Sequence, residues 1–520
     1  MAFRINRKTA GTHSRQLFGI IAHKYREKPY RREVPFGSLG VKQIINFLPR
    51  GTYAGAVAFR ERRRHGDRTS QRKSGVIRTL AQNAYYIGRA EFDLDTSTPI
   101  IYNKYKQARQ KPRKNMTKKP RILLTYVESG KGHKTSMQSI ADSLKNKYGS
   151  ELELIEDNIM EHSPITQKYE RFLTKQVQNT NSMKGFGPFM FWFIEVMGAQ
   201  KFLNFLCKTL FRKPFDETLL AIDRHKPDVI VCTHYFLTYC AIEYKILFNP
   251  SVEIVTYNPD NNVHTWWDGR DGWFFVNNEF AQNEAVRKRG FKAENIRLVN
   301  YTKRQVIMDA TGSKADYRKR YGLPQDKFTV IIADGAYALG ESRKYAKKLL
   351  KTKKPLTILF IAGENDKVYL KMVKERYKLG KKGKTNITLR VYHFMPMIHE
   401  LYKASDLFIT KAGPNSILDS VLMGTPVCVN FCPQPMEKAA YIHFVKKLGC
   451  GFAQFKASKI RPTVEKLIDD PSLLDKYRDN IARIAASENG ADTIADFIYE
   501  RALAKKENER CAEHSASGTK

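Results

Sequence analysis

The chain has 520 residues, 42% of them hydrophobic and 12% aromatic, which is enough apolar material for two globular domains and excludes a disordered protein. No run of about 18 uninterrupted apolar residues occurs, which argues against a membrane-spanning segment. Seven scattered cysteines without a CxxC pair indicate reduced thiols and argue against a disulfide scaffold or a zinc site.

Positive charge is concentrated at the beginning of the chain. The formal net charge is +38, and residues 1–115 alone contain 26 Lys and Arg against 7 Asp and Glu. A basic surface attracts nucleic acid or anionic lipid, and charge alone does not choose between them. We expect residues 1–115 to form a basic, partly disordered extension; the alternative is that Met116 is the natural start. Asp93 and Asp95 resemble a metal-binding Asp-x-Asp, but they precede the repeated pattern described next, and we expect no metal there.

From Arg121 onward, short apolar runs alternate with Gly-containing loops and segments of helical spacing. This alternation predicts an α/β fold with two Rossmann-like domains at residues 116–300 and 301–480, followed by a C-terminal helix and polar tail at 481–520. The expected strands are residues 122–126, 228–232, 253–257, 329–333, 357–361, 387–391, 407–410 and 427–431. In such sheets ligands bind at the carboxyl ends of the strands.

The first candidate loop, ESGKGH at residues 128–133, follows a strand and opens a helix expected at 135–148. Its glycines would let the backbone approach a ligand, but it matches neither GxxxxGK[ST] nor GxGxxG. His133 ends this loop, and a side chain that titrates near neutrality suits a general base. A surface histidine that caps the helix is the alternative.

Two loops of the second domain have the form of phosphate sites. DGAYALG, residues 334–340, follows a strand and would cradle a diphosphate with backbone N–H groups. KAGPNSILDS, residues 411–420, leads from a strand into a helix start, a position suited to phosphate. Asp419, one turn further on, is placed to reach ribose hydroxyls. An ordinary helix cap with a solvated aspartate is the alternative.

Several segments, in chain order over about residues 119–500, resemble the motifs of one enzyme family. KAGPNSILDSVLMGTPVCVN is similar to the KAGPGT-x-x-E-A-x-x-x-G-x-P motif of the diacylglycerol glycosyltransferases. These include the monogalactosyldiacylglycerol synthases and the bacterial processive glucosyltransferases. The segments ESGKGHKTSMQSI, KPDVIVCTHYF, VTYNPDNNVHTWWDGRDGWFFVNNE and ILFIAGENDK resemble further motifs of the same family.

The resemblance implies a GT-B fold, in which two Rossmann-like domains face a cleft, and an inverting, metal-independent transfer from UDP-sugars that needs no cofactor. It implies that His133 is the catalytic base or the partner of the acceptor hydroxyl, with Glu128 beside it. The implied donor site consists of Gly335 and Gly340 at the diphosphate, Phe394 and Met397 at the uracil, Gly413, Pro414, Asn415 and Ser416 at phosphate, Asp419 at the ribose and Glu437 at the sugar hydroxyls.

This sequence departs from the family pattern at several positions. The family's Thr-Asp pair reads Thr256-Tyr257, so an aspartate is missing unless Asp260 replaces it. The family's glutamate is Asp419, and its Q-E-x-x-N reads MEKAA at residues 436–440. These changes fit an altered choice of sugar or a reduced activity.

A segment rich in aromatic and basic side chains, residues 183–215, is the one stretch that would supply a membrane-docking surface to the first domain. Such a composition on a helix fits insertion at the level of lipid headgroups; a core-facing pair of amphipathic helices is the alternative. The candidate acceptor and membrane residues are Phe189, Phe191, Trp192, Phe193, Lys201 and Arg212.

Together these features predict a peripheral membrane glycosyltransferase. We expect it to transfer a hexose from a UDP-hexose to a lipid, diacylglycerol foremost, on an anionic membrane surface at the cytoplasmic face, with nucleic acid not expected as a partner. One alternative is N-acetylglucosaminyl transfer to a polyprenyl-diphosphate-linked cell-wall precursor. The other is a catalytically weak lipid- or nucleic-acid-binding protein on the same fold.

Overall fold

A computed structural model describes residues 119–128, 132–182, 209, 211–338, 340–383, 386–432 and 434–517. The predicted basic extension at 1–115 therefore lies outside the described residues. So do five of the six predicted membrane residues, namely Phe189, Phe191, Trp192, Phe193 and Lys201. Among the described residues, no helix is both long and apolar enough to cross a membrane.

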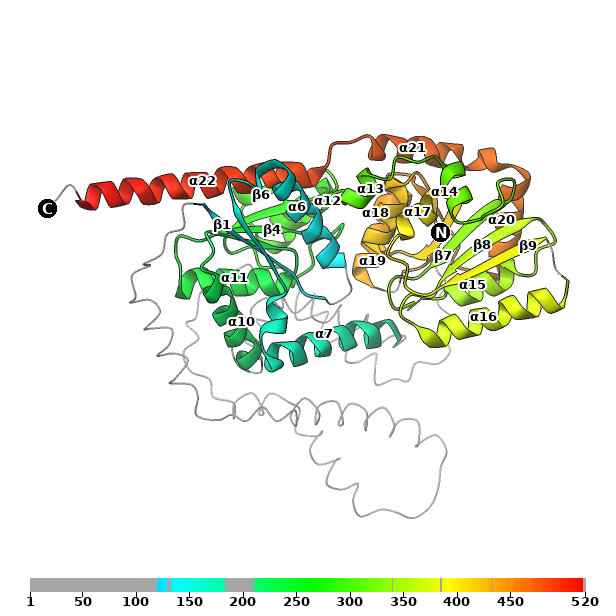
Figure 1. Cartoon of the computed structure of the whole chain (residues 1–520), viewed down its shortest axis with the longest axis horizontal. Helices are drawn as coiled ribbons and strands as arrows, with labels where there is room; N and C mark the ends of the chain where they lie inside the picture. The colour runs from blue at the N-terminus through cyan, green and yellow to red at the C-terminus, as the bar shows by residue number, and fades with distance from the viewer. Residues whose placement is uncertain are drawn as a thin grey trace, which may run out of the picture. The chain divides into compact units, whose positions relative to one another are not determined.

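The first domain is built on a parallel sheet with the strand order β2-β1-β3-β4-β5-β6 (Figure 1). Its strands are β1 (Arg121–Thr125), β2 (Glu153–Asp157), β3 (Val229–Cys232), β4 (Glu253–Tyr257), β5 (Trp273–Val276) and β6 (Ile296–Leu298). Its helices are α6 (Gly132–Tyr148), η1 (Ile159–His162), α7 (Pro164–Ser182), α10 (Arg212–His225), α11 (Tyr235–Leu247), α12 (Glu279–Arg289) and η2 (Ala293–Asn295). The central strands are continuous apolar runs because helices cover both faces of the sheet.

The second domain repeats the arrangement with the strand order β12-β11-β10-β7-β8-β9, again parallel throughout. Its strands are β7 (Phe328–Ala333), β8 (Leu356–Ile361), β9 (Ile387–Tyr392), β10 (Leu407–Lys411), β11 (Val427–Phe431) and β12 (Gly451–Ala453). Alternate side chains of β7 and β8 enter two separate cores, one on each face of the sheet. The predicted pair of Rossmann-like α/β domains is confirmed.

Short and long helices surround this second sheet. They are α13 (Gln305–Met308), α14 (Lys314–Arg320), α15 (Ser342–Leu349), α16 (Asp366–Lys381), α17 (Ile398–Lys403), α18 (Pro414–Leu422), α19 (Pro435–Ala440), the π-helix η3 (Tyr441–Lys447), α20 (Ala457–Asp469), η4 (Pro471–Leu474) and α21 (Asp475–Ala485). α15 and α20 pack on one face, whereas α17 and α18 pack on the other.

The last helix, α22 (Gly490–Ser517), returns to the first domain (Figure 1). Ile494 and Ile498 are fully buried in the core that also contains Ile122 and Leu124 of β1. Further along the helix, the ammonium groups of Lys505 and Lys506 lie 3.2 and 3.1 Å from the carboxylate of Asp228. The C-terminal helix expected within residues 481–520 is thus a structural part of the first domain.

Candidate active site

His133 lies in the first turn of α6, where the loop after β1 enters the helix. Its Nδ1 is 2.5 Å from the backbone carbonyl oxygen of Thr233, the residue directly after β3. A carbonyl only accepts hydrogen bonds, so Nδ1 carries the proton and Nε2 keeps its lone pair. In return, the Thr233 hydroxyl donates to the His133 carbonyl at 2.9 Å, which fixes the helix start to the neighbouring strand.

Burial lowers the pKa of His133 to about 4, and the hydrogen bond to Thr233 opposes this shift only in part. At neutral pH the imidazole is therefore uncharged. A neutral ring with a fixed tautomer and a free lone pair on Nε2 is the form that a general base needs.

Two more histidines gather around His133. His234 caps α11, where its Nδ1 accepts from the backbone N–H of Phe236 at 3.2 Å, and its ring meets that of His133 edge-on with centroids 4.7 Å apart. His264 follows β4, and burial first, then the nearby His133, lowers its pKa to about 3. Burial also lowers the pKa of His234. The cluster is therefore uncharged at neutral pH, which avoids repulsion between buried imidazolium groups.

Asp260 follows β4 and lies close to this cluster. Its Oδ2 is 3.8 Å from Nε2 of His264, and burial raises the pKa of its carboxyl group to about 7. Its backbone N–H donates to the Asn258 side chain at 3.0 Å, which fixes the turn. Asp260 lies three residues after Tyr257, the position where the family's aspartate is missing, and its raised pKa lets it titrate near neutrality.

Glu128 has partners of its own. Its carboxylate lies 2.6 Å from the ammonium of Lys134, and its backbone N–H donates to Glu170 at 2.7 Å. The structure thus places Glu128 in an ion pair at the entrance of α6. Residues 129–131 of the same loop lie outside the described residues.

In the second domain, Asp334 joins the predicted diphosphate loop to the predicted phosphate loop. It is 1% exposed, and its two oxygens accept from the backbone N–H groups of Ser342 at 2.6 Å and Lys411 at 2.9 Å. Gly335 has a φ of +76°, and a Cβ on Gly340 would collide with the Asp334 carboxylate. Glycine is therefore required at both predicted positions, for backbone conformation at Gly335 and for close approach at Gly340.

The predicted helix start at residues 413–416 is present. Gly413 is the N-cap and Pro414 the first residue of α18, and no side chain among the described residues caps the first turn. The backbone N–H groups of Asn415 and Ser416 can therefore donate to an anion, which the dipole of α18 also favours. A Cβ added to Gly132 would lie 2.5 Å from Nδ2 of Asn415, so the beginnings of α6 and α18 are close neighbours.

Two of the residues predicted to bind the UDP-sugar already form ion pairs within the protein. Oδ2 of Asp419 lies 2.6 Å from Nη2 of Arg304. To bind the ribose as predicted, the Asp419 carboxylate would have to contact Arg304 and the ribose at the same time. Burial raises the pKa of Asp419, with Arg304 opposing the shift. Glu437 is 3% exposed, binds the ammonium of Lys411 at 2.7 Å, and accepts from the backbone N–H of Gln434 at the start of α19. Lys411 in turn is the last residue of β10, two residues before Gly413 at the start of α18.

The predicted uracil residues lie beyond the end of β9. Phe394 and Met397 are 43% and 41% exposed, although they are large and apolar. Exposed apolar side chains at the carboxyl edge of a parallel sheet are suited to pack against a flat ring. Of the predicted membrane residues, the structure describes Arg212, which begins α10 and lies 3.5 Å from Asp216.

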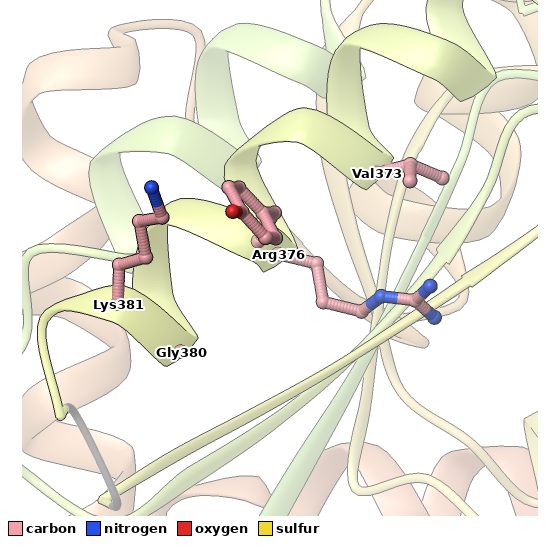
Figure 2. A pocket seen from close by; sticks show the side chains of 5 residues that line it. Val373, Arg376, Gly380 and Lys381 are labelled. Carbon is pink, nitrogen blue, oxygen red and sulfur yellow. The ribbon is translucent and has the colours of Figure 1, made fainter.

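The described residues also form an open hollow of about 350 Å³ along α16, lined by Val373, Arg376, Tyr377, Gly380 and Lys381 (Figure 2). All five residues come from the one helix, and none is a predicted site residue. Sequence reasoning missed Asp334, Lys411 and Arg304, which hold the donor loops together. Asp334 and Lys411 are the first residues of the two quoted loops, but nothing in the sequence indicated their contacts, and Arg304 lies in no quoted motif.

Comparison with known proteins agrees with the order of these loops. Residues 133–299 match the monogalactosyldiacylglycerol (MGDG) synthase family, and residues 333–497 match the glycosyltransferase family 28 C-terminal domain. The processive diacylglycerol beta-glucosyltransferase of Bacillus pumilus is 20% identical over 390 residues, which cover 75% of this chain and 97% of that protein. Monogalactosyldiacylglycerol synthase 2 of Arabidopsis thaliana is 22% identical over 406 residues, covering 72% of this chain and 80% of the relative.

Among solved structures, MurG of Acinetobacter baumannii is similar with 13% identity and a TM-score of 0.46, over 74% of this chain and 99% of that one. The two family matches follow one another along the chain without overlap; the first begins at His133, and the second contains the phosphate loop of α18. By these matches, residues 133–299 belong to the MGDG synthase family and residues 333–497 are a glycosyltransferase family 28 C-terminal domain.

Proposed function

We propose that this protein is an inverting glycosyltransferase that transfers a hexose from a UDP-hexose to the hydroxyl group of diacylglycerol. The observation that carries the proposal is the fixed tautomer of His133, whose Nδ1–H donates to the Thr233 carbonyl and leaves Nε2 as a base. Family membership supplies the reaction class, because the relatives named above act on diacylglycerol or form monogalactosyldiacylglycerol.

In this reaction the acceptor hydroxyl oxygen attacks the anomeric carbon of the hexose from the side opposite UDP. A bond forms between this oxygen and the anomeric carbon while the bond from that carbon to the diphosphate breaks. The hydroxyl proton passes to Nε2 of His133, and UDP leaves with the electron pair. Because attack and departure occur on opposite faces, the configuration at the anomeric carbon inverts.

The departing UDP gains negative charge, which the second domain is suited to stabilise. The amides of Asn415 and Ser416 at the start of α18 would bind the diphosphate, together with the backbone of the loop at residues 334–340. Asp419 would accept hydrogen bonds from the ribose hydroxyls and Glu437 from the sugar hydroxyls, while each keeps its ion pair with Arg304 or Lys411. Phe394 and Met397 would pack on the uracil.

A lipid acceptor requires contact with a membrane. The net charge of +38 favours an anionic surface, at about 1 kcal/mol for each Lys or Arg close to it. The aromatic and basic segment at residues 183–215 would insert at the headgroup level, on the cytoplasmic face. We propose a peripheral attachment of this kind.

The base assignment is tested by comparing His133→Gln with a matched control, His393→Gln. His393 is a half-exposed histidine 3.7 Å from Asp366, in the second domain and away from the cluster. With a UDP-hexose and diacylglycerol in vesicles, His133→Gln should lower kcat by about 100-fold or more, the contribution expected of a general base, whereas His393→Gln should not change it. Equal turnover of wild type and His133→Gln would overturn the assignment.

Two competing functions are separated by the choice of acceptor and ligand. If the chain transfers N-acetylglucosamine to a polyprenyl-diphosphate-linked sugar, the full-length protein should be active on that acceptor and inactive on diacylglycerol. If it is a binding protein on the same fold, no acceptor should yield product, and a chain shortened to begin at Met116 should lose nucleic-acid or lipid binding. Formation of glycosylated diacylglycerol excludes both.

A further inference from the structure

A second cluster of polar side chains lies in the first domain. The Nε2 atoms of His162 and His225 are 2.6 and 2.5 Å from the same oxygen, Oδ2 of Asp157. All three donor atoms lie within 4.8 Å of one another. The side chains are between 18% and 25% exposed, so the cluster is largely enclosed but remains open to solvent.

Three separate elements hold the cluster. Asp157 ends β2, a strand that pairs with β1 along its whole length. His162 ends η1, a short helix capped by the Asn158 side chain, which accepts from the backbone N–H of Met160 at 3.2 Å. His225 is the last residue of α10, which stops there because Lys226 adopts a left-handed conformation with φ of +45°. The negative end of the α10 dipole therefore faces the cluster and favours a cation.

We propose that Asp157, His162 and His225 bind a zinc-class divalent metal ion. Two imidazole nitrogens and one carboxylate oxygen are a ligand set that zinc accepts, with solvent or another ligand in the fourth position. With zinc–nitrogen bonds of about 2.0–2.1 Å, tetrahedral ligand atoms lie about 3.3 Å apart. The two contacts to Asp157 would therefore open by somewhat less than about 1 Å, which rotation of three partly exposed side chains accommodates.

The ion would connect parts of the chain that are otherwise far apart in sequence, since Asp157 and His225 are 68 residues apart. It would join η1, which directly precedes α7, to the end of α10. In the sequence, α7 and α10 are the helices on either side of the aromatic and basic segment. Asn158 next to Asp157 also contacts Glu170, which accepts from the backbone N–H of Glu128. We assign the ion a stabilising role in the first domain, and this inference does not depend on the proposed function.

The test uses the full-length chain without an affinity tag, freed of metal by a chelator and dialysis. Zinc is titrated in competition with a chromophoric chelator, and cobalt(II) is added separately because its visible absorption reports tetrahedral coordination. The wild type should bind one equivalent of zinc and show the tetrahedral cobalt spectrum. His162→Gln and His225→Gln should each weaken zinc binding by at least about 10-fold, whereas the control His393→Gln should not.

Thermal unfolding of the wild type gives a result that needs no variant. Zinc should raise the Tm of the metal-free protein, because an ion that binds only the folded state stabilises it. The alternative is a metal-free cluster in which both imidazoles donate to the Asp157 carboxylate. An unchanged Tm with zinc, no equivalent bound, or binding that both glutamine variants retain would overturn the proposal.

Discussion

The dependence of activity on pH should separate two groups at the candidate active site. With its pKa lowered to about 4, His133 would be about 1% protonated at pH 6, whereas a histidine at the ordinary value of 6.5 would be about three-quarters protonated. We therefore expect no loss of kcat/KM through His133 between about pH 8 and pH 5. Asp260, with its pKa raised to about 7 by burial, changes its charge within that same interval.

The assay is kcat/KM for UDP-hexose over this range, in the wild type and in Asp260→Asn. Because the Asp260 carboxylate forms as the pH rises through about 7, any change in rate near neutrality should belong to this group and should disappear in Asp260→Asn. NMR of the His133 ring should show no titration in the same range. An acid limb near pH 6.5 that persists in Asp260→Asn, with a His133 signal that follows it, would refute the reasoning.

Three further tests concern the donor loops, the packing of α22 and the ion pair of Asp419. Gly340→Ala puts a Cβ against a buried carboxylate and should raise KM for the UDP-sugar. The control is Gly380→Ala, whose added Cβ has no atom of the described residues within 4 Å; it should leave KM unchanged and raise the free energy of unfolding by about 0.5–1 kcal/mol. Ile498→Ala in α22 should lower the free energy of unfolding by about 2–5 kcal/mol in a denaturant titration, and a loss below about 1 kcal/mol would contradict the burial of this helix. Arg304→Met removes the ion-pair partner of Asp419 and should lower the free energy of unfolding by about 2 kcal/mol. Adding Asp419→Ala to this variant should restore part of that free energy; additive losses from the two substitutions would argue against the ion pair.

Much of the fold was predictable because the central strands are long apolar runs. The predicted strands at residues 253–257 and 427–431 match β4 and β11 residue for residue. β2 was missed because its sequence, ELIED, carries three acidic residues and forms a partly exposed sheet edge. β12 was missed because three residues, GFA, carry no periodic signal. The packing of α22 on the first domain is a long-range contact that no local pattern specifies.

The candidate site was predictable as a set of loops, but not as a set of contacts. Family motifs located His133 and the start of α18, and both lie where a strand leads into a helix. The tautomer of His133 depends on a carbonyl 100 residues away, which sequence spacing does not encode. For the same reason the partners of Asp419 and Glu437 were missed, since Arg304 is 115 residues from the first and Lys411 is 26 from the second. The cluster of Asp157, His162 and His225 could not be predicted either, because its histidines form no short motif.

The most direct test of the proposed transfer is the anomeric configuration of the product. The full-length chain is incubated with UDP-glucose or UDP-galactose, in which the sugar is α-linked, and with diacylglycerol in vesicles that contain anionic lipid. The coupling constant of the anomeric proton in the purified glycolipid is then measured by NMR. In-line attack by an acceptor oxygen that His133 deprotonates predicts a β-linked hexosyl diacylglycerol; an α-linked product, or no glycolipid from either donor, would contradict the account.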